Sequence, residues 1–313
     1  MRPPVWTIPP DLTDDHISIL SATTPKVWHI DIDKVWRQIW TEGGDGENET
    51  IAILDTGGNP HNDLPQPIKE RSFIPGQTAR DPRSGHGTHC AGTALGRNGI
   101  GFAPRANYMI GKVLSDSGLG GSDGIAEGIR WAVDEGATII SMSLGGSQPY
   151  RPTEEALEYA VQNGVLVVAA AGNNGQSNRD TTGWPGRYRS TLCIGSYNQA
   201  GGISDFSSSG PSVDIVFPGT AIVSCSNGGM NLYRTMSGTS MACPGGGGGF
   251  ACVRSWMARL GMPRLGGAPA WRPLLANYCV DKGTAGRDNI YGEGVADFTK
   301  IVNAMLQHKL TYV

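Results

Sequence analysis

The sequence predicts an α/β protein with a three-layer, doubly wound and mostly parallel sheet that carries helices on both faces. Short apolar runs of strand length alternate along the chain with longer segments in which apolar residues recur at helical spacing. That alternation is typical of parallel strands joined by crossover helices, which cover both faces of a sheet. The 313 residues show no internal repeat and no linker, so one large domain is the simplest organisation.

The chain opens with a segment rich in proline and polar residues. We expect residues 1–25 to be an N-terminal extension and 26–313 to be the domain. A short helix is predicted to lead into the domain, because four apolar residues recur there at helical spacing: Ile32, Trp36, Ile39 and Trp40. Residues 42–49 predict a turn. The apolar run that follows ends in Asp55 and is typical of a buried parallel strand.

The remaining strands and helices are predicted to alternate. Later apolar runs predict strands at 107–114, 137–144, 165–172, 191–198 and 212–219. Between them, a helix is predicted over 123–135, where four apolar residues share one face: Ile125, Ile129, Ala132 and Val133. A second helix has Pro152 near its start and Gly164 as its stop. Weaker patterns predict helices near 270–280 and 296–308.

Composition and charge exclude several classes of protein. The net charge is −3, from 28 acidic and 25 basic residues, which gives no basic field for nucleic acid or an anionic membrane. No apolar run approaches the roughly 18 residues of a membrane span. The first residues lack the basic start and apolar core of a signal peptide. A cytoplasmic location is therefore expected, with a secreted mature form as the alternative.

The six cysteines are expected to be mostly reduced thiols. None of them forms a C-x-x-C pair, so a structural zinc site is not expected. A chain of this length also does not need a disulfide framework to fold.

Four polar residues lie where an α/β sheet gathers its active groups, at the carboxyl ends of strands. Asp55 ends one predicted strand and Asn173 follows another, while His86 and Ser240 lie in the small-residue segments SGHGTHCAG and SGTSMACP. Each alone has an ordinary explanation as a turn, cap or core residue. Together they are the residue types that nucleophilic catalysis needs. A serine needs an imidazole to take its proton, the imidazole needs a carboxylate, and the resulting oxyanion needs fixed donors.

Five motifs in the same order resemble those of the subtilisin-like serine proteases: AILDTGG, SGHGTHCAGT, ISMSLGG, VVAAAGNNG and MSGTSMACP. The resemblance covers most of the chain. It implies a serine endopeptidase that acts on extended polypeptides through an acyl-enzyme and needs no cofactor for the chemistry. It also implies that Asp55 orients His86, which serves as general base and then as general acid. Ser240 would be the nucleophile, and Asn173 would donate to the oxyanion together with the Ser240 backbone N–H.

The same resemblance implies a groove for extended substrate. Its predicted lining residues are Gly118, Leu119, Gly120, Ile125, Ser143, Leu144, Gly145 and Gly183. The segment 118–120 would pair with substrate by strand addition, and Leu144 would face an apolar pocket that Ile125 also lines. Gly183 would leave the pocket for the residue before the scissile bond roomy, which predicts a preference for large apolar or aromatic residues. The alternative is that these glycines only make turns.

One metal site is implied, at Asp214. The short loop after His86 resembles the proteinase K branch of the family, in which an aspartate at this position binds calcium with backbone carbonyls of the segment TLCIG. A carboxylate with carbonyl oxygens is a suitable ligand set for calcium. The structural alternative is that Asp214 caps a strand.

Five consecutive glycines, Gly245 to Gly249, depart from the family pattern directly after the nucleophile segment. Each glycine costs roughly 0.8–1 kcal/mol relative to alanine in a helix interior, so the run would cost a helix about 4–5 kcal/mol. Three outcomes are open. The helix forms because packing overrides propensity, the segment is loose until substrate binds, or the chain is an altered copy with little activity.

The N-terminal segment VWTIPP, residues 5–10, could act as an intramolecular inhibitor that covers the active site, as the short extensions of intracellular subtilisins do. A disordered tail and a chain trimmed to its mature form are the alternatives. For the whole chain the sequence predicts a subtilisin-like serine endopeptidase. Two other functions stay open: a catalytically weak homologue that binds extended peptides, and a variant that passes the acyl group to an amine.

Overall fold

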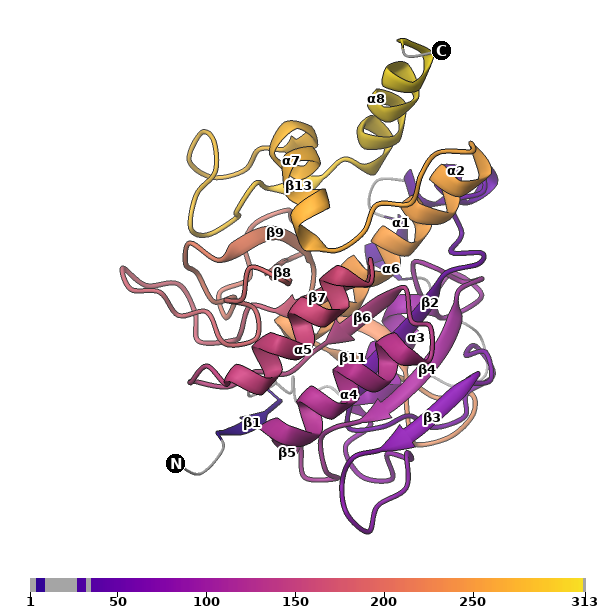
Figure 1. Ribbon diagram of the computed structural model, residues 1–313, viewed down its shortest axis with the longest axis vertical. Helices are drawn as coiled ribbons and strands as arrows, with labels where there is room; N and C mark the ends of the chain where they lie inside the picture. The colour runs from indigo at the N-terminus through magenta and orange to yellow at the C-terminus, as the bar shows by residue number, and fades with distance from the viewer. Residues whose placement is uncertain (1–3, 9–26, 32–34, 312–313) are drawn as a thin grey trace.

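A computed structural model describes residues 4–8, 27–31 and 35–311 of the chain (Figure 1). At its centre lies one sheet of seven strands, all parallel to their neighbours. From one edge to the other, the strands are β3 (Lys69–Ser72), β4 (Asn107–Lys112), β2 (Thr50–Asp55), β6 (Ile139–Met142), β7 (Leu166–Ala170), β8 (Leu192–Tyr197) and β9 (Val213–Pro218). The predicted fold class is confirmed.

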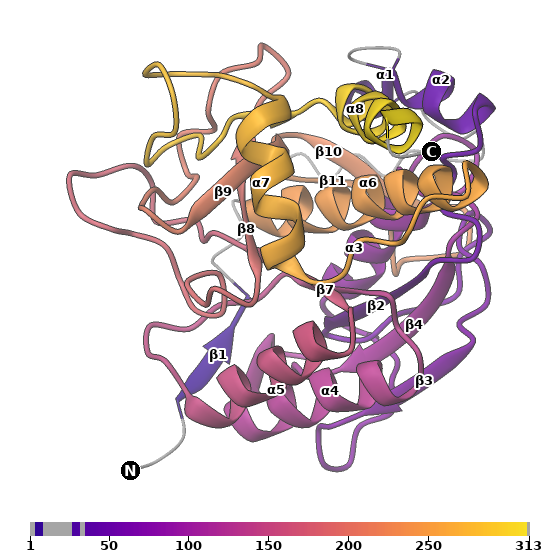
Figure 2. The same ribbon diagram turned by 45° about the horizontal axis from the view of Figure 1, so that its top comes forward.

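Helices cover both faces of the sheet and complete the three layers (Figure 2). The two helical layers are α3 (His86–Leu95) with α6 (Thr239–Arg259), and α4 (Ser122–Asp134) with α5 (Arg151–Gln162). Side chains alternate across a strand, so a central strand can contribute to both cores. Ile51 and Ile53 of β2 pack in the core of α3 and α6, and Ala52 between them packs in the core of α4 and α5.

The other elements lie around these layers. They are β1 (Val5–Thr7), α1 (Trp28–Asp31), α2 (Val35–Thr41), β5 (Leu119–Gly121), β10 (Ile222–Cys225), β11 (Tyr233–Met236), α7 (Ala268–Tyr278), β12 (Cys279–Val280), β13 (Val295–Ala296) and α8 (Phe298–Thr311). In the part of the chain that the structure describes, no helix combines the length and the apolar character that crossing a bilayer would require.

The predicted strands and helices are present, with ends that differ by a few residues. The predicted first helix begins at Val35 in the structure, and Ile32 lies outside the described residues. The sequence does not predict β3, because its residues KERS are exposed or half-buried and form no apolar run. Because β3 is an edge strand that pairs only with β4, it can form without a buried face.

The glycine run is helical. α6 continues through Gly245–Gly249, and these glycines are buried. A Cβ atom on Gly248 would lie 2.3 Å from the carbonyl oxygen of Ala94 in α3. A Cβ atom on Gly249 would lie 2.9 Å from the side chains of both Trp36 and Phe298. The structure shows the helix of the first outcome: it packs closely against its neighbours, and its buried contacts override the low helix propensity of glycine. The third outcome concerns activity and stays a prediction.

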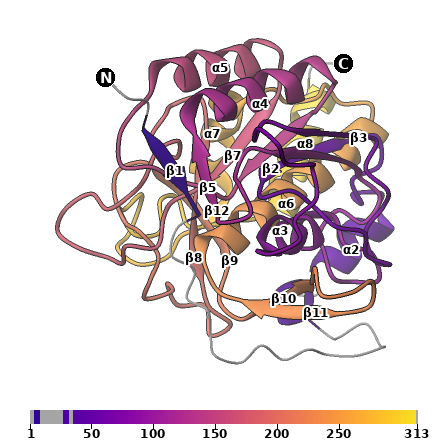
Figure 3. The same ribbon diagram turned by 90° about the horizontal axis from the view of Figure 1, so that it is seen from below.

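The N-terminal extension is attached to the domain where the structure describes it. β1 pairs antiparallel with β5, more than a hundred residues along the chain (Figure 3). Trp6 of β1 is fully buried in the core of α4 and α5. A disordered tail is thus a wrong description of residues 4–8. The predicted domain boundary at residue 25 falls within residues 9–26, outside the described residues, and stays a prediction.

Candidate active site

Asp55 and His86 meet at the carboxyl edge of the sheet. Asp55 ends β2, and His86 is the first residue of α3. The His86 Nδ1 atom lies 2.7 Å from Asp55 Oδ1, and both side chains are only 1% exposed. The Thr56 backbone N–H donates to the same carboxylate oxygen at 2.7 Å. A carboxylate in this position holds an imidazole in one tautomer and one orientation, and it stabilises the imidazolium form.

Two glycines allow α3 to begin so close to β2. Gly85, directly before the helix, has a φ of 72°, a left-handed conformation that glycine adopts without strain. A Cβ atom on Gly87 would lie 2.0 Å from the carbonyl oxygen of Gly57. Any side chain at Gly87 would therefore push the start of α3, and His86 with it, away from Asp55.

A second carboxylate, which was not predicted from the sequence, supports this pair. Asp81 is fully buried, and its Oδ2 accepts a hydrogen bond from Thr56 Oγ1 at 2.5 Å. Thr56 Oγ1 in turn accepts from the Gly87 N–H at 3.0 Å, and the other Asp81 oxygen accepts from the Ser84 N–H at 3.0 Å. Burial raises the pKa of Asp81 above its ordinary value. This network joins the end of β2 to the first turn of α3, and no local motif marks it.

Ser240 lies in the first turn of α6, and Pro244 shapes its surroundings. Proline has no N–H, so it cannot donate a helical hydrogen bond to the carbonyl of Ser240, four residues earlier. Two side chains take its place: Ser143 Oγ donates to Ser240 O at 2.8 Å, and the Cys90 thiol donates at 3.4 Å. Ser240 is fully buried, and its Oγ has no hydrogen-bond partner among the described residues.

Cys90 connects the two halves of the site. Its Sγ lies 3.8 Å from His86 Nδ1 and 3.4 Å from Ser240 O, so one thiol contacts both residues. Burial raises the pKa of the Cys90 thiol to about 11, so the group is neutral at neutral pH. The ligand atoms of Asp55, His86 and Cys90 lie within 4.8 Å of one another. Here Asp55 and His86 bind each other, and Cys90 contacts His86 and the carbonyl of Ser240.

Asn173 follows β7 and reaches the start of the same helix. Its Oδ1 accepts hydrogen bonds from the Thr239 N–H at 2.9 Å and from Thr239 Oγ1 at 2.8 Å. Because a carboxamide is planar, fixing Oδ1 also fixes the direction of the Nδ2 amide. The first N–H groups of a helix have no acceptor within the helix. The start of α6 can thus offer the Ser240 N–H and the Asn173 amide as a pair of donors.

β1 runs between the two predicted walls of the substrate groove. Thr7 pairs with Leu119 of β5 on one side. On the other side, Thr7 exchanges two backbone hydrogen bonds with Gly145, at 2.9 and 2.8 Å. The Ile8 N–H donates to Gly118 O at 3.2 Å. The chain's own N-terminal strand therefore lies where the sequence predicts an extended substrate.

Trp6 packs against residues that were predicted to line an apolar pocket beside this groove. It lies opposite Gly120 in the ladder and packs in one hydrophobic cluster with Ile125 and Leu144. The indole N–H donates to Ser122 Oγ at 2.5 Å. Of the predicted groove residues, Ser143 is placed differently, because its buried hydroxyl turns toward the carbonyl of the nucleophile candidate.

A pocket of about 450 Å³ lies beside Thr7, and its lining includes Asn173 and Gly183. A Cβ atom on Gly183 would meet nothing closer than a backbone oxygen at 3.6 Å, so glycine leaves this part of the pocket open. The lining also includes Asp180 and Arg187, which form an ion pair at 3.0 Å. This ion pair was not predicted from the sequence, because neither residue belongs to a motif.

The predicted calcium ligand Asp214 has other partners. Its Oδ1 accepts a hydrogen bond from Arg272 Nε at 2.8 Å, and its Oδ2 accepts from Arg272 Nη2 at 3.1 Å. The Cys193 N–H donates to Oδ2 at 2.8 Å. A cationic side chain thus already binds both carboxylate oxygens, and with Arg272 in place these residues do not fit a calcium ion.

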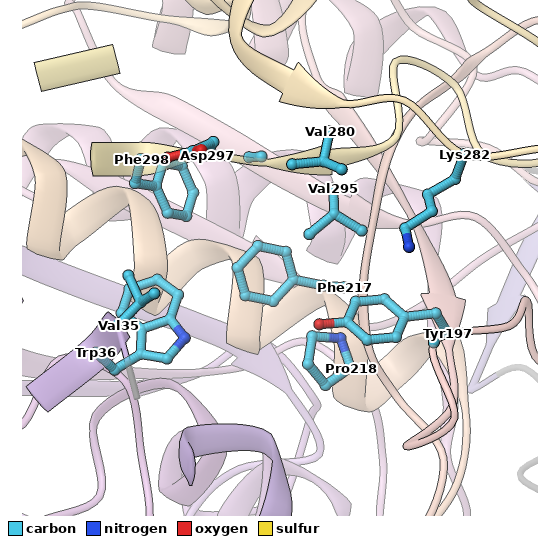
Figure 4. Close-up of a pocket in the computed structure, with 12 residues that line it drawn as sticks. Val35, Trp36, Tyr197, Phe217, Pro218, Val280, Lys282, Val295, Asp297 and Phe298 are labelled. Carbon is cyan, nitrogen blue, oxygen red and sulfur yellow. The ribbon is translucent and has the colours of Figure 1, made fainter. Parts of the chain in front are cut away.

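Another cavity, of about 380 Å³, lies between the ends of β8 and β9 and the start of α8 (Figure 4). Aromatic side chains dominate its lining: Trp36, Tyr197, Phe217 and Phe298. It contains none of the site residues predicted from the sequence, and we assign it no part in the chemistry.

Known proteins are similar to this chain over most of its length. Residues 46–294 match the Subtilase family. The chain is 34% identical to subtilisin BL from Lederbergia lenta over 258 residues, which cover 80% of this chain and 90% of that protein. It is 36% identical to subtilisin DY from Bacillus licheniformis over 224 residues, 70% of this chain and 81% of that protein. The major intracellular serine protease of Bacillus subtilis is 38% identical over 232 residues, with coverages of 70% and 72%.

Proposed function

The chain belongs to the subtilase family and is a serine endopeptidase, and on that premise we propose that Asp55, His86 and Ser240 form its catalytic triad. Asn173 is proposed as the side-chain oxyanion donor. The observation that carries the proposal is the buried contact of 2.7 Å between His86 Nδ1 and Asp55 Oδ1, at the edge where Ser240 contacts the same thiol as His86. The chemistry needs no cofactor.

In the proposed mechanism, Ser240 Oγ attacks the carbonyl carbon of the peptide while His86 Nε2 takes its proton. Asp55 stabilises the imidazolium that results. The tetrahedral oxyanion accepts hydrogen bonds from the Ser240 N–H and the Asn173 amide. His86 then protonates the leaving amine, and a water molecule repeats the sequence on the acyl-enzyme. Catalytic hydrogen bonds are often long without substrate and shorten in the complex, which fits a Ser240 hydroxyl that has no hydrogen-bond partner among the described residues.

The proposed substrate is an extended polypeptide with a large apolar or aromatic residue before the scissile bond. The pocket of about 450 Å³ beside Asn173 supports this preference, since Gly183 leaves it open. Asp180 and Arg187 in its lining form an ion pair, so their opposite charges neutralise each other. A single charge at this residue of the substrate would therefore find no free countercharge in that pair.

The N-terminal strand is proposed to act as an intramolecular inhibitor. Substrate would need the backbone groups of segment 118–120 and Gly145, and β1 already uses them. Trp6 packs with Ile125 and Leu144, which are proposed to line the adjacent apolar pocket. The full chain would thus hydrolyse substrate slowly until β1 leaves the groove. Weak activity of the full chain would then not require a defect in the triad.

A fluorophosphonate probe tests the proposed nucleophile. We expect covalent labelling of the full chain, and its complete loss in Ser240→Ala. Ser177→Ala is the matched control, because Ser177 is an exposed serine outside the proposed site. The Trp6→Ala variant is tested as well, because its groove should be open. If both the full chain and this variant are well folded and remain unlabelled, a peptide-binding homologue is favoured.

The proposed location is the cytoplasm. The likeness to a major intracellular serine protease supports it. All six cysteines are free thiols, as expected for a reducing compartment.

A further inference from the structure

A cluster of oxygen atoms converges on one guanidinium group at the edge of the sheet. Asp214 of β9 supplies two carboxylate oxygens, and its side chain is only 2% exposed. Arg272 of α7 donates to both of them, at 2.8 and 3.1 Å. The same guanidinium donates to the carbonyl oxygens of Arg189 at 2.6 Å and Thr191 at 2.5 Å. One side chain therefore collects four oxygens from two separate segments.

This oxygen set is of the kind that a calcium ion takes. Calcium prefers carboxylate and carbonyl oxygens and completes its shell with water. Carbonyl oxygens that face a buried carboxylate repel one another unless a cation lies between them. Arg272 supplies that cation in a form suited to the geometry, since a guanidinium is planar, always charged and able to bind a carboxylate with two parallel N–H groups.

A second arginine completes the charge. Arg287 Nη2 lies 3.9 Å from Asp214 Oδ1 and donates to the carbonyl oxygens of Val213 at 2.7 Å and Pro211 at 3.1 Å. The two guanidinium groups together bring the positive charge of one calcium ion to this carboxylate. They come from α7 and from the loop before β13, so the cluster also ties the C-terminal part of the chain to β9.

We propose that Arg272 is the resident cation of the Asp214 site and takes the place that the sequence predicts for calcium. The chain consequently does not bind calcium at Asp214. Its oxygen cluster is a latent calcium site, which becomes available when the guanidinium is removed. The proposal concerns the stability of the fold and does not depend on the proposed catalytic roles.

Calcium titration of the full chain by calorimetry tests the proposal. Arg272→Ala is expected to bind one calcium ion more per chain than the wild type, and the double variant Arg272→Ala with Asp214→Asn is expected to lose that ion. Saturating calcium should raise the Tm of Arg272→Ala by roughly 5 °C relative to its effect on the wild type. Arg287→Ala is the matched control: it removes a guanidinium from the same carboxylate but leaves Arg272 in place, so it should bind no additional calcium.

Two results would overturn the proposal. One is a folded Arg272→Ala chain whose calcium stoichiometry equals that of the wild type. The other is a wild-type calcium stoichiometry that falls in the single variant Asp214→Asn, because calcium would then already use Asp214. This second comparison needs no arginine variant, so it decides the question even if Arg272→Ala does not fold. Folding of Arg272→Ala in calcium but not in magnesium would support the proposal.

Discussion

The proposed catalytic side chains are each held at one atom so that another atom points toward the reaction. Asp55 holds His86 at Nδ1, which directs Nε2 to the far side of the ring. Thr239 holds Asn173 at Oδ1, which directs the Nδ2 amide. The carbonyl of Ser240 is held by two neighbouring side chains because Pro244 cannot donate to it. The proposed site therefore depends on how each side chain is oriented as well as on which residue types are present.

Replacement of Asn173 by alanine tests the oxyanion role. The loss known for such a donor in subtilisin is on the order of 10²–10³ in kcat, and we expect a loss of that size here. KM should change little, because the donor acts mainly in the transition state. Steady-state kinetics on a peptide substrate measure both constants. Asn174→Ala, at the exposed neighbouring position, should keep kcat. If Asn173→Ala raised KM by as large a factor as it lowered kcat, the assignment would be contradicted.

At the scale of elements, the distance between α3 and α6 sets the distance between the two halves of the proposed site. His86 begins α3 and Ser240 lies in the first turn of α6. Gly248 lets the two helices touch, since any Cβ there would meet Ala94 O at 2.3 Å. Gly246 faces Ile194 at 3.6 Å, which is ordinary contact distance. The glycine run thus combines positions that need glycine with positions that only tolerate it.

Two alanine substitutions separate these kinds of glycine. Gly246→Ala should stabilise the chain by roughly 1 kcal/mol, because alanine has the higher helix propensity and the space is present. Gly248→Ala should destabilise the chain and also lower kcat, because it forces α3 and α6 apart. Urea unfolding in a Ser240→Ala background avoids self-cleavage, and kinetics use the active chain. Equal effects of the two substitutions would show that close helix packing is not the reason for the glycines.

The β1 strand is a second element whose role can be measured. Trp6 is fully buried, whereas Val5 on the same strand is 63% exposed. Loss of a buried tryptophan costs roughly 3–5 kcal/mol, so Trp6→Ala should release β1 and raise the initial kcat/KM of the full chain at least about tenfold. Ser122→Ala, which removes the acceptor of the indole N–H, should have a smaller effect in the same direction. Val5→Ala is the control. If the Trp6→Ala chain were no more active than the Val5→Ala chain, this result would argue against inhibition by β1.

For the whole molecule, the proposed site lies where the two cores and the carboxyl edge of the sheet meet. β2 and β7 deliver Asp55 and Asn173 to this edge, and helices of one layer deliver the other two residues. The same compactness buries groups that titrate. His89, one turn after His86, uses Nε2 to contact Ile222 O and Arg234 O, each at 3.0 Å. It thereby joins α3 to the β10–β11 hairpin.

This burial predicts that the fold is sensitive to acid. Desolvation lowers the pKa of His89 from 6.5 to about 3, so the native state disfavours its charged form. The contribution of His89 is fully present above about pH 6.5 and is lost as pH falls toward 3, by up to about 1.4 kcal/mol per pH unit. Urea unfolding of the Ser240→Ala chain between pH 7 and 4 should show this loss.

His89→Gln keeps an N–H donor but cannot titrate in this range, so its stability should fall less steeply with acid. Some slope should remain, because burial also lowers the pKa of His61. An unchanged slope in the variant would show that His89 is not the group responsible.

The sequence by itself determined the alternation of strands and helices and the chemical types at the carboxyl edge. Apolar runs and helical periodicity are local properties, so β2, α5 and β7 could be predicted nearly to the residue. The order of Asp55, His86, Asn173 and Ser240 is equally visible, because each lies in a short motif of small residues. An edge strand such as β3 could not be predicted, since nothing apolar marks it.

Only the tertiary structure decided how distant parts of the chain meet. It placed β1 between 118–120 and Gly145, turned Ser143 to the carbonyl of Ser240, and filled the Asp214 site with Arg272. The partners in these contacts lie between about 58 and 140 residues apart in the chain. Such contacts depend on which surfaces pack together and which charges are buried, and no local pattern encodes that. The residue types follow from the sequence, whereas their partners follow from the fold.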